Sequence, residues 1–233
     1  MIYTDAELNE NREKLESLKK LFCTVPPDWD RIRKELAAGD CSEDDLTELA
    51  VAVTDECFCE YRDALDPEVM AVTEETMYSR HVVTALEILL EYGLNPNHFI
   101  DGENPMWNTQ WMDAPNVGAC ALRLLLEHGG DPNLLTEYDP ETLFEYVAFK
   151  VAEDVDGKNY LCIVQCWWVL LAYGGCYRDG SIPIAMLKDK DVSIFKDFER
   201  FYFIIERGAP KNIYDWKMHI YDRETREEVA QYW

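Results

Sequence analysis

The stretch Cys120-Ala-Leu-Arg-Leu-Leu-Leu-Glu-His-Gly-Gly-Asp-Pro-Asn133 decides the fold of this chain, because it recurs. The same order of apolar run, glycine and polar turn occupies residues 84–97, which read Thr-Ala-Leu-Glu-Ile-Leu-Leu-Glu-Tyr-Gly-Leu-Asn-Pro-Asn. Weaker copies lie at residues 166–179 and 199–212. One such unit cannot bury its apolar face alone, so the repetition predicts copies that stack on one another and share a core.

Each copy carries the signals of a helix and of its end. The leucines of residues 122–126 predict a buried helix. Gly129 predicts the left-handed residue that ends it, and Asp131-Pro-Asn133 predicts the turn that follows. The anchor glycines are 36, 45 and 34 positions apart. The four anchors are Gly93, Gly129, Gly174 and Gly208.

Leu124 to Asn133 resembles the second helix and exit turn of the ankyrin repeat family, whose period is about 33 residues. The first helix of that family usually opens with Thr-Pro-Leu-His. The matching places here read Asn104-Pro-Met-Trp107, Glu141-Thr-Leu-Phe144 and, less closely, Ser181-Ile-Pro-Ile184. The resemblance covers roughly residues 76–216, with degenerate repeats. It is closer than a likeness to tetratricopeptide repeats, which lack the Gly-x-Asn/Asp-Pro-Asn signal.

We therefore expect an all-α fold, an ankyrin-like solenoid of stacked antiparallel helix pairs with an atypical N-terminal helical cap. Residues 1–75 form the acidic cap in this interpretation, and residues 76–233 form the repeats and a C-terminal cap. The long middle interval predicts an insertion near residues 150–160. The charged, aromatic tail from residue 214 predicts a final exposed helix.

Two helices are expected within the cap. One follows Asp28, which can cap it, and stops at Gly39. The next begins at Asp40 or Ser42 with acidic residues in its first turn, where the helix dipole favours them.

The net charge of −24 is unevenly spread. Residues 1–75 hold 21 acidic and 8 basic side chains, residues 76–160 hold 14 and 4, and residues 161–233 hold 11 and 10. Phosphate contact needs a basic footprint, so this distribution excludes ordinary nucleic-acid binding through the first two-thirds. It favours a protein partner with a basic surface, although a solubilising charge on solvated helix faces remains the alternative.

The composition and motifs also limit the cellular compartment and the chemistry that we expect for this chain. The longest apolar run, Leu161 to Tyr173, is interrupted by Gln165, and the N-terminus lacks the pattern of a secretion signal, so we expect a cytoplasmic protein without a membrane span. The eight cysteines are then expected to be reduced packing residues. No phosphate loop, nucleophile elbow or metal-binding spacing occurs, so we expect no catalytic residue, no metal site and no cofactor.

The aromatic side chains suggest where a partner would bind. The family resemblance implies that the projecting turns and the first helices form a concave binding face. Several aromatic residues follow the anchor glycines, and two tryptophans lie four positions apart on an expected first helix. The predicted partner-binding residues are Phe99, Trp107, Trp111, Glu137, Tyr138, Glu145, Tyr177, Tyr214 and Trp216.

The favoured function is non-catalytic binding of another protein through an acidic, aromatic-rich concave face. One alternative is an immunity or inhibitor protein, possibly mimicking nucleic acid, that neutralises a basic partner. A second is an enzyme with scattered carboxylates on a helical scaffold. A third is a structural scaffold within a larger assembly.

Overall fold

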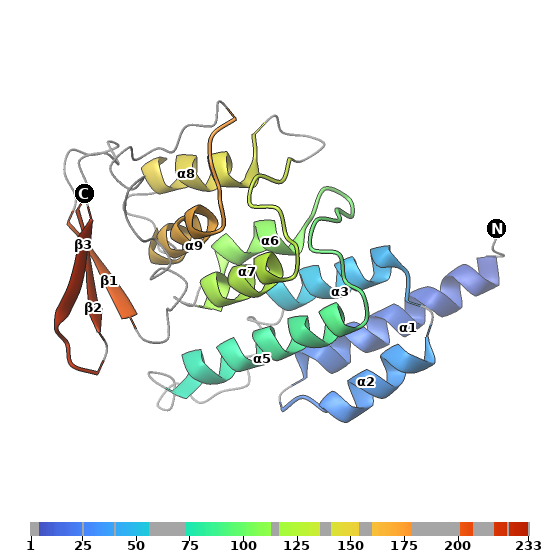
Figure 1. Ribbon diagram of the computed structural model, residues 1–233. Helices are drawn as coiled ribbons and strands as arrows, with labels where there is room; N and C mark the ends of the chain where they lie inside the picture. The colour runs from blue at the N-terminus through green and yellow to red at the C-terminus, as the bar shows by residue number, and fades with distance from the viewer. Residues whose placement is uncertain are drawn as a thin grey trace.

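The computed structural model describes residues 5–24, 26–39, 41–55, 73–112, 117–135, 141–153, 160–178, 201–206, 217–222 and 224–232. Over these ranges the chain is mostly helical, as expected. A three-stranded sheet near the C-terminus departs from the all-α prediction, and Figure 1 shows it beyond α8 and α9, at the far side of the molecule from the N-terminus.

The first three helices are α1 (Asp5–Cys23), α2 (Trp29–Ala38) and α3 (Glu43–Asp55), and α1 packs against both of the others. Asp28 caps α2 as predicted, because its carboxylate accepts the N–H of Arg31 at 3.1 Å. Ser42 caps α3 through a capping box with Asp45, in which each side chain accepts the backbone N–H of the other residue at 3.1 and 2.8 Å. Gly39 does follow α2, but its backbone is extended (φ −114°).

Three helices end in the same way. They are α5 (Thr73–Glu91), α7 (Val117–Glu127) and α9 (Tyr160–Ala172). Gly93, Gly129 and Gly174 follow them with φ of +96°, +95° and +93°, which confirms the left-handed residue predicted at each end. In each case the N–H after the glycine donates to the carbonyl five residues earlier, at 3.0, 3.0 and 2.8 Å. This is the Schellman pattern, in which a glycine lets the last carbonyls of a helix be satisfied.

Shorter helices precede α7 and α9. The first is α6 (Pro105–Asn108), continued by the 3-10 turn η1 (Thr109–Trp111), and the second is α8 (Leu143–Glu153). Asn104 caps α6 by accepting the N–H of Met106 at 2.9 Å, and Thr142 caps α8 by accepting the N–H of Glu145 at 3.1 Å. The counterpart of Asn104-Pro-Met-Trp107 is therefore Thr142-Leu-Phe-Glu145, one residue later than the match proposed from sequence.

Packing supports this corrected alignment. A Cβ added at Gly130 would lie 2.6 Å from the sulfur of Met106, and one at Gly175 would lie 2.5 Å from the ring of Phe144. Met106 and Phe144 are both third in their motifs, and both are fully buried. Each helix pair is thus closed by one large first-helix side chain against a glycine at the end of the second helix.

The successive helix pairs lie side by side. Contacts join α3 to α5, α5 to α7 and α7 to α9, and α6 lies against both α3 and α7. Two asparagines in equivalent turns connect neighbouring units. Asn97 donates to the carbonyl of Gly129 at 2.9 Å and accepts the N–H of Asp131 at 2.7 Å. Asn133 likewise donates to the carbonyl of Gly174 at 3.3 Å and accepts the N–H of Cys176 at 2.9 Å.

The prediction of a helix in the fourth copy, at residues 199–212, is wrong. Its apolar run forms β1 (Phe201–Glu206), which pairs antiparallel with β2 (Lys217–Asp222). The tail, predicted to be a helix, contains β2 and β3 (Glu228–Tyr232), which are also antiparallel partners. Phe-Tyr-Phe-Ile-Ile consists entirely of aromatic and β-branched residues, which favour a strand, whereas the runs at residues 85–90 and 121–126 are mostly leucine and alanine. Gly208 lies outside the described residues, as do the residues of the predicted insertion from 154 to 159.

The core runs through all the helix pairs. Cys120 and Cys166 are buried as predicted, and Cys162 lies 3.5 Å from the carbonyl of Thr109. Burial raises the pKa of the Cys166 thiol, so it stays protonated. Gly118 lies so close to η1 that an added Cβ would collide with the carbonyl oxygen of Thr109.

Candidate protein-binding surface

The structure describes the side chains of four of the nine predicted binding residues. Glu137, Tyr138, Tyr214 and Trp216 lie outside the described residues, and only the backbone of Trp111 is described. The other four predicted residues are Phe99, Trp107, Glu145 and Tyr177. Of these, Phe99 is half-buried in the turn that follows Asn97.

Glu145 has a structural role that the sequence analysis did not predict. Its carboxylate accepts the N–H of Thr142 at 3.1 Å, which completes the capping box of α8, and it accepts the N–H of Arg178 at 3.0 Å. The guanidinium of Arg178 lies 3.0 Å away, and the Glu145 side chain is only 13% exposed. Burial alone would raise the pKa of Glu145, but the hydrogen bonds from Arg178 and Thr142 outweigh it and lower the pKa. Glu145 therefore joins the turn after α9 to the start of α8.

Tyr177 also serves packing. Its ring meets that of Phe144 edge to face, with centroids 5.6 Å apart, and its side chain is half-buried against the core. Phe144 in turn contacts Trp167, whose ring is 1% exposed. The sequence analysis predicted Tyr177 as a binding residue and not as a packing residue, because its contact with Phe144 joins residues that are far apart in the chain.

Trp107 lies where a binding residue was expected, on the first helix of a unit. Its ring contacts that of Tyr146 with centroids 4.8 Å apart, so the pair bridges α6 and α8. The indole Nε1 is buried and has no hydrogen-bond acceptor within the part of the chain that the structure describes. Packing rather than hydrogen bonding holds this ring.

Two further residues extend this contact along α8. Phe149 is 49% exposed, and Lys150 places its ammonium 5.5 Å from the centroid of Tyr146 and 5.8 Å from that of Phe149. We call Trp107, Tyr146 and Phe149 the aromatic strip. Sequence reasoning missed Tyr146 and Phe149 because it considered only the aromatics of the turns and of the first helix that contains Trp107. The available signal was their spacing of three on a helix whose opposite face, at Val147 and Ala148, is apolar.

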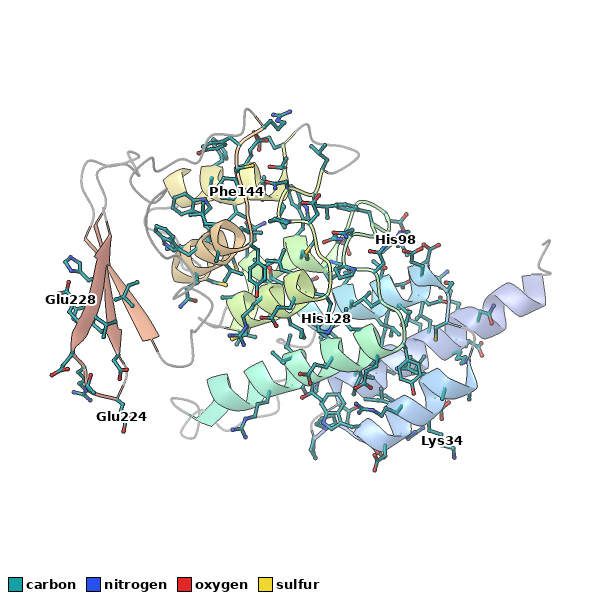
Figure 2. All side chains as sticks on the ribbon, viewed as in Figure 1. Lys34, His98, His128, Phe144, Glu224 and Glu228 are labelled. Atoms are coloured by element: carbon teal, nitrogen blue, oxygen red, sulfur yellow. The ribbon has the colours of Figure 1, made fainter. Side chains whose placement is uncertain are left out.

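Acidic side chains gather where the turns meet α3. The amide of Asn95 donates to Glu43 at 2.8 Å, and His98 Nε2 lies 2.6 Å from the carboxylate of Asp44. Figure 2 shows His98 beside this end of the stack. These contacts hold the turn after α5 against the start of α3.

The turn that precedes α6 adds two more carboxylates. Ile100 and Glu103 form a bridge, and the exposed side chains of Asp101 and Glu103 lie at its tip. Asn104 fixes this tip beside the same turn by donating to the carbonyl of His98 at 2.7 Å. We call Glu43, Asp44, Asp101 and Glu103 the acidic edge.

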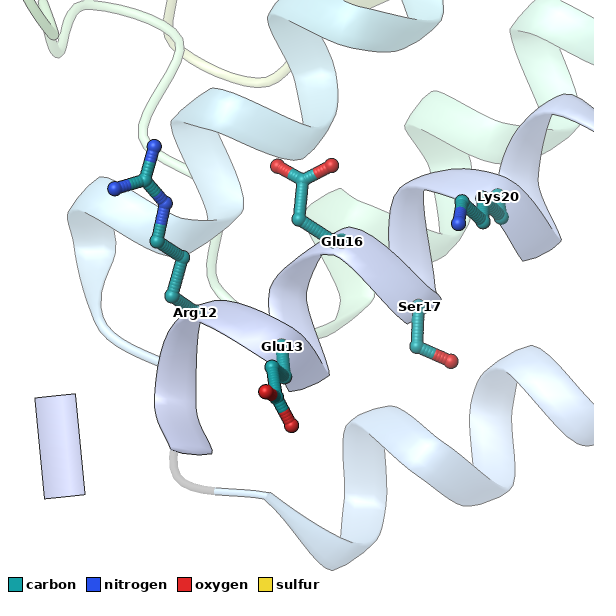
Figure 3. Close-up of a pocket in the computed structure, with 5 residues that line it drawn as sticks. All are labelled: Arg12, Glu13, Glu16, Ser17 and Lys20. Atoms are coloured by element: carbon teal, nitrogen blue, oxygen red, sulfur yellow. The ribbon is translucent and has the colours of Figure 1, made fainter. Parts of the chain in front are cut away.

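Other features offer little chemistry. A surface hollow is lined by five side chains of α1 alone, which mix both charges as solvated helix residues do; they are Arg12, Glu13, Glu16, Ser17 and Lys20 (Figure 3). In the ranges described above, no three His, Cys, Asp or Glu side chains come together so that they could hold a metal ion. Within the same ranges, no helix has the length and apolar character needed to cross a bilayer.

His81 is a core residue. It is 3% exposed, its Nε2 lies 2.5 Å from the carbonyl of Phe22, and its ring meets Trp29 edge to face at 5.1 Å. Burial lowers the pKa of His81 in spite of the hydrogen bond to Phe22, so the ring is held neutral.

Comparisons of the chain with protein-family models, with curated proteins and with solved structures found no match. The geometry of the described residues is therefore the basis for assigning a function.

Proposed function

We propose that this chain is a non-catalytic protein-binding module built from degenerate ankyrin-like repeats, and that it binds a basic protein through the acidic edge and the aromatic strip. The observation that carries the proposal is the pair of equivalent asparagine bridges from Asn97 and Asn133, which set successive turns side by side. Repeated units aligned in this way leave a long open flank, which is the surface that repeat proteins use for recognition.

The ankyrin-like interpretation has support in local geometry. Three second helices share one Schellman ending. Two first helices share one capping position, at Asn104 and Thr142, and each is preceded by a small antiparallel bridge. Helices that were not related as repeats would not be expected to share the same cap, bridge and ending in the same order.

Charge supports a basic partner. Residues 1–160 contain 35 acidic and 12 basic side chains. Several of the cations are already neutralised, since Lys19 lies 2.6 Å from Glu48 and Arg33 lies 3.0 Å from Glu91. The uncompensated carboxylates would raise the encounter rate with a basic surface, and this effect would fall with salt. Burial of aromatic surface would then supply most of the affinity.

Affinity capture from the native cell tests the proposal. The edge variant combines Asp101→Asn with Glu103→Gln. The matched control combines Glu13→Gln with Glu87→Gln, two exposed acids on α1 and α5 that carry the same charge change. We expect the edge variant to recover much less partner than the control, and recovery to fall as salt rises. Equal recovery by the two variants at every salt concentration would show that the acidic edge does not bind the partner.

An inhibitor that mimics nucleic acid is a second candidate, favoured by the concentration of carboxylates in the first two-thirds of the chain. This version predicts that duplex DNA displaces the captured partner, because both would occupy one basic surface. A partner that binds DNA and this chain at the same time would exclude mimicry and leave general protein binding in place.

A further inference from the structure

We infer that the aromatic strip, together with Lys150, is a site for an arginine side chain of the partner, and that Lys150 occupies this site in the free protein. The inference rests on the proposed function and specifies the chemistry of one contact. Its main observation is that a cation already lies over these rings, with the Lys150 ammonium within 6 Å of the centroids of both Tyr146 and Phe149.

The rings are arranged to receive a cation from solvent. Trp107 packs against Tyr146 across the boundary between α6 and α8, which fixes one side of the strip. Phe149 is 49% exposed, so one ring remains open to a partner. The negative faces of aromatic rings attract cations electrostatically, and the attraction grows as the partner excludes water.

The net charge of this part of the sequence favours a cation over an anion. Residues 76–160, which contain the whole strip, hold 14 acidic and only 4 basic side chains. An incoming anion would meet this excess of like charge. An uncharged apolar group would not be attracted by this negative charge.

Arginine is favoured over lysine because of how each cation stacks. A guanidinium is planar, less strongly hydrated than an ammonium, and suited to lying flat on an aromatic face. Lys150 reaches the rings only through a flexible stem anchored on α8. A partner arginine would therefore replace the Lys150 ammonium, which would return to water.

The test uses the full chain and a defined probe, a capped tetra-arginine peptide, with tetra-citrulline as its uncharged counterpart of the same shape. Binding is measured by titration calorimetry. Phe149→Ala leaves the net charge unchanged and should weaken tetra-arginine binding about two- to five-fold, the weight of one exposed cation–π contact. Tetra-citrulline should not bind to any form.

Lys150→Met keeps most of the side-chain volume, removes the ammonium from the rings and makes the chain more negative by one charge. Arg80→Met, on the exposed surface of α5, makes the same charge change elsewhere and is the matched control. We expect Lys150→Met to bind tetra-arginine more tightly than Arg80→Met does. Circular dichroism of each variant checks that the helices are intact.

Two results would overturn the site. Phe149→Ala could bind the peptide as wild type does, or Lys150→Met could show no gain over Arg80→Met. If either occurred while partner capture still depended on Asp101 and Glu103, the arginine site would be wrong and the proposed function would stand. If the peptide results held while capture did not depend on the acidic edge, the proposed function would fail instead.

Discussion

The asparagine bridges make the stacking of repeats directly testable. Asn133→Ala removes two hydrogen bonds between neighbouring units, one of 3.3 Å to the carbonyl of Gly174 and one of 2.9 Å from the N–H of Cys176. A net hydrogen bond contributes about 1 kcal/mol, and the longer of these two contributes less. Cys176 is half-buried, so its N–H regains only part of its solvation from water. We expect Asn133→Ala to lower the free energy of unfolding by about 1–2 kcal/mol.

Equilibrium urea unfolding, followed by circular dichroism, gives this free energy. Asn97→Ala breaks the equivalent bridge and should cost a similar amount, because its two bonds measure 2.9 and 2.7 Å. Asn11→Ala, at an exposed position of α1, is the control and should be neutral or slightly stabilising, since alanine is the better helix former. Losses below about 0.5 kcal/mol for both bridge variants would refute the claim that these side chains hold the units in register.

Three further predictions follow from the packing and the pKa shifts. Gly118→Ala should destabilise the protein by about 3 kcal/mol, because the added Cβ would collide with a backbone carbonyl. Gly129→Ala, where the Cβ would lie in open space but φ is +95°, should cost only about 1–2 kcal/mol. Thermal unfolding of the two variants measures this difference. Burial lowers the pKa of His81, so the unfolded chain takes up this proton first and stability falls as the pH drops below about 6.5. The stability advantage of wild type over His81→Gln should therefore shrink from pH 8 to pH 5 in urea titrations. The pKa of Glu145 is lowered mainly because hydrogen bonds from Arg178 and Thr142 outweigh burial. Its contribution is present above its ordinary pKa and is lost as the pH falls through its folded value, so Glu145→Gln should cost about 1 kcal/mol at pH 7 and progressively less in acid.

Much of the helical fold was predictable because its signals are local. A glycine after a leucine-rich helix marks the end of that helix wherever it occurs, and Gly93, Gly129 and Gly174 all behave in this way. The same local pattern at Gly208 was misleading. Its apolar run pairs with residues 217–222, and that pairing depends on a sequence-distant partner that the pattern does not contain.

The surface was less predictable than the core for a related reason. Whether an aromatic residue is exposed depends on its neighbours in the next unit. Tyr177 packs on Phe144, more than thirty positions earlier, while Phe149 has no such cover from the described residues and stays half exposed. The sequence match began the first-helix motif at Glu141, whereas the structure places the cap at Thr142. The capping role of Glu145 follows only from the second alignment.

The turns therefore divide their side chains between two tasks. Side chains directed along the stack, those of Asn97 and Asn133, satisfy backbone groups of the next unit and fix its position. Side chains at the tip before α6, those of Asp101 and Glu103, are exposed, so we expect their substitution to leave the register of the units unchanged. A surface of this kind can vary its charge without loss of the fold, provided that the asparagines remain. This separation explains how repeats that differ at the start of their first helices can share a glycine ending, and how the two turns at Asn97 and Asn133 can share the same bridging asparagine.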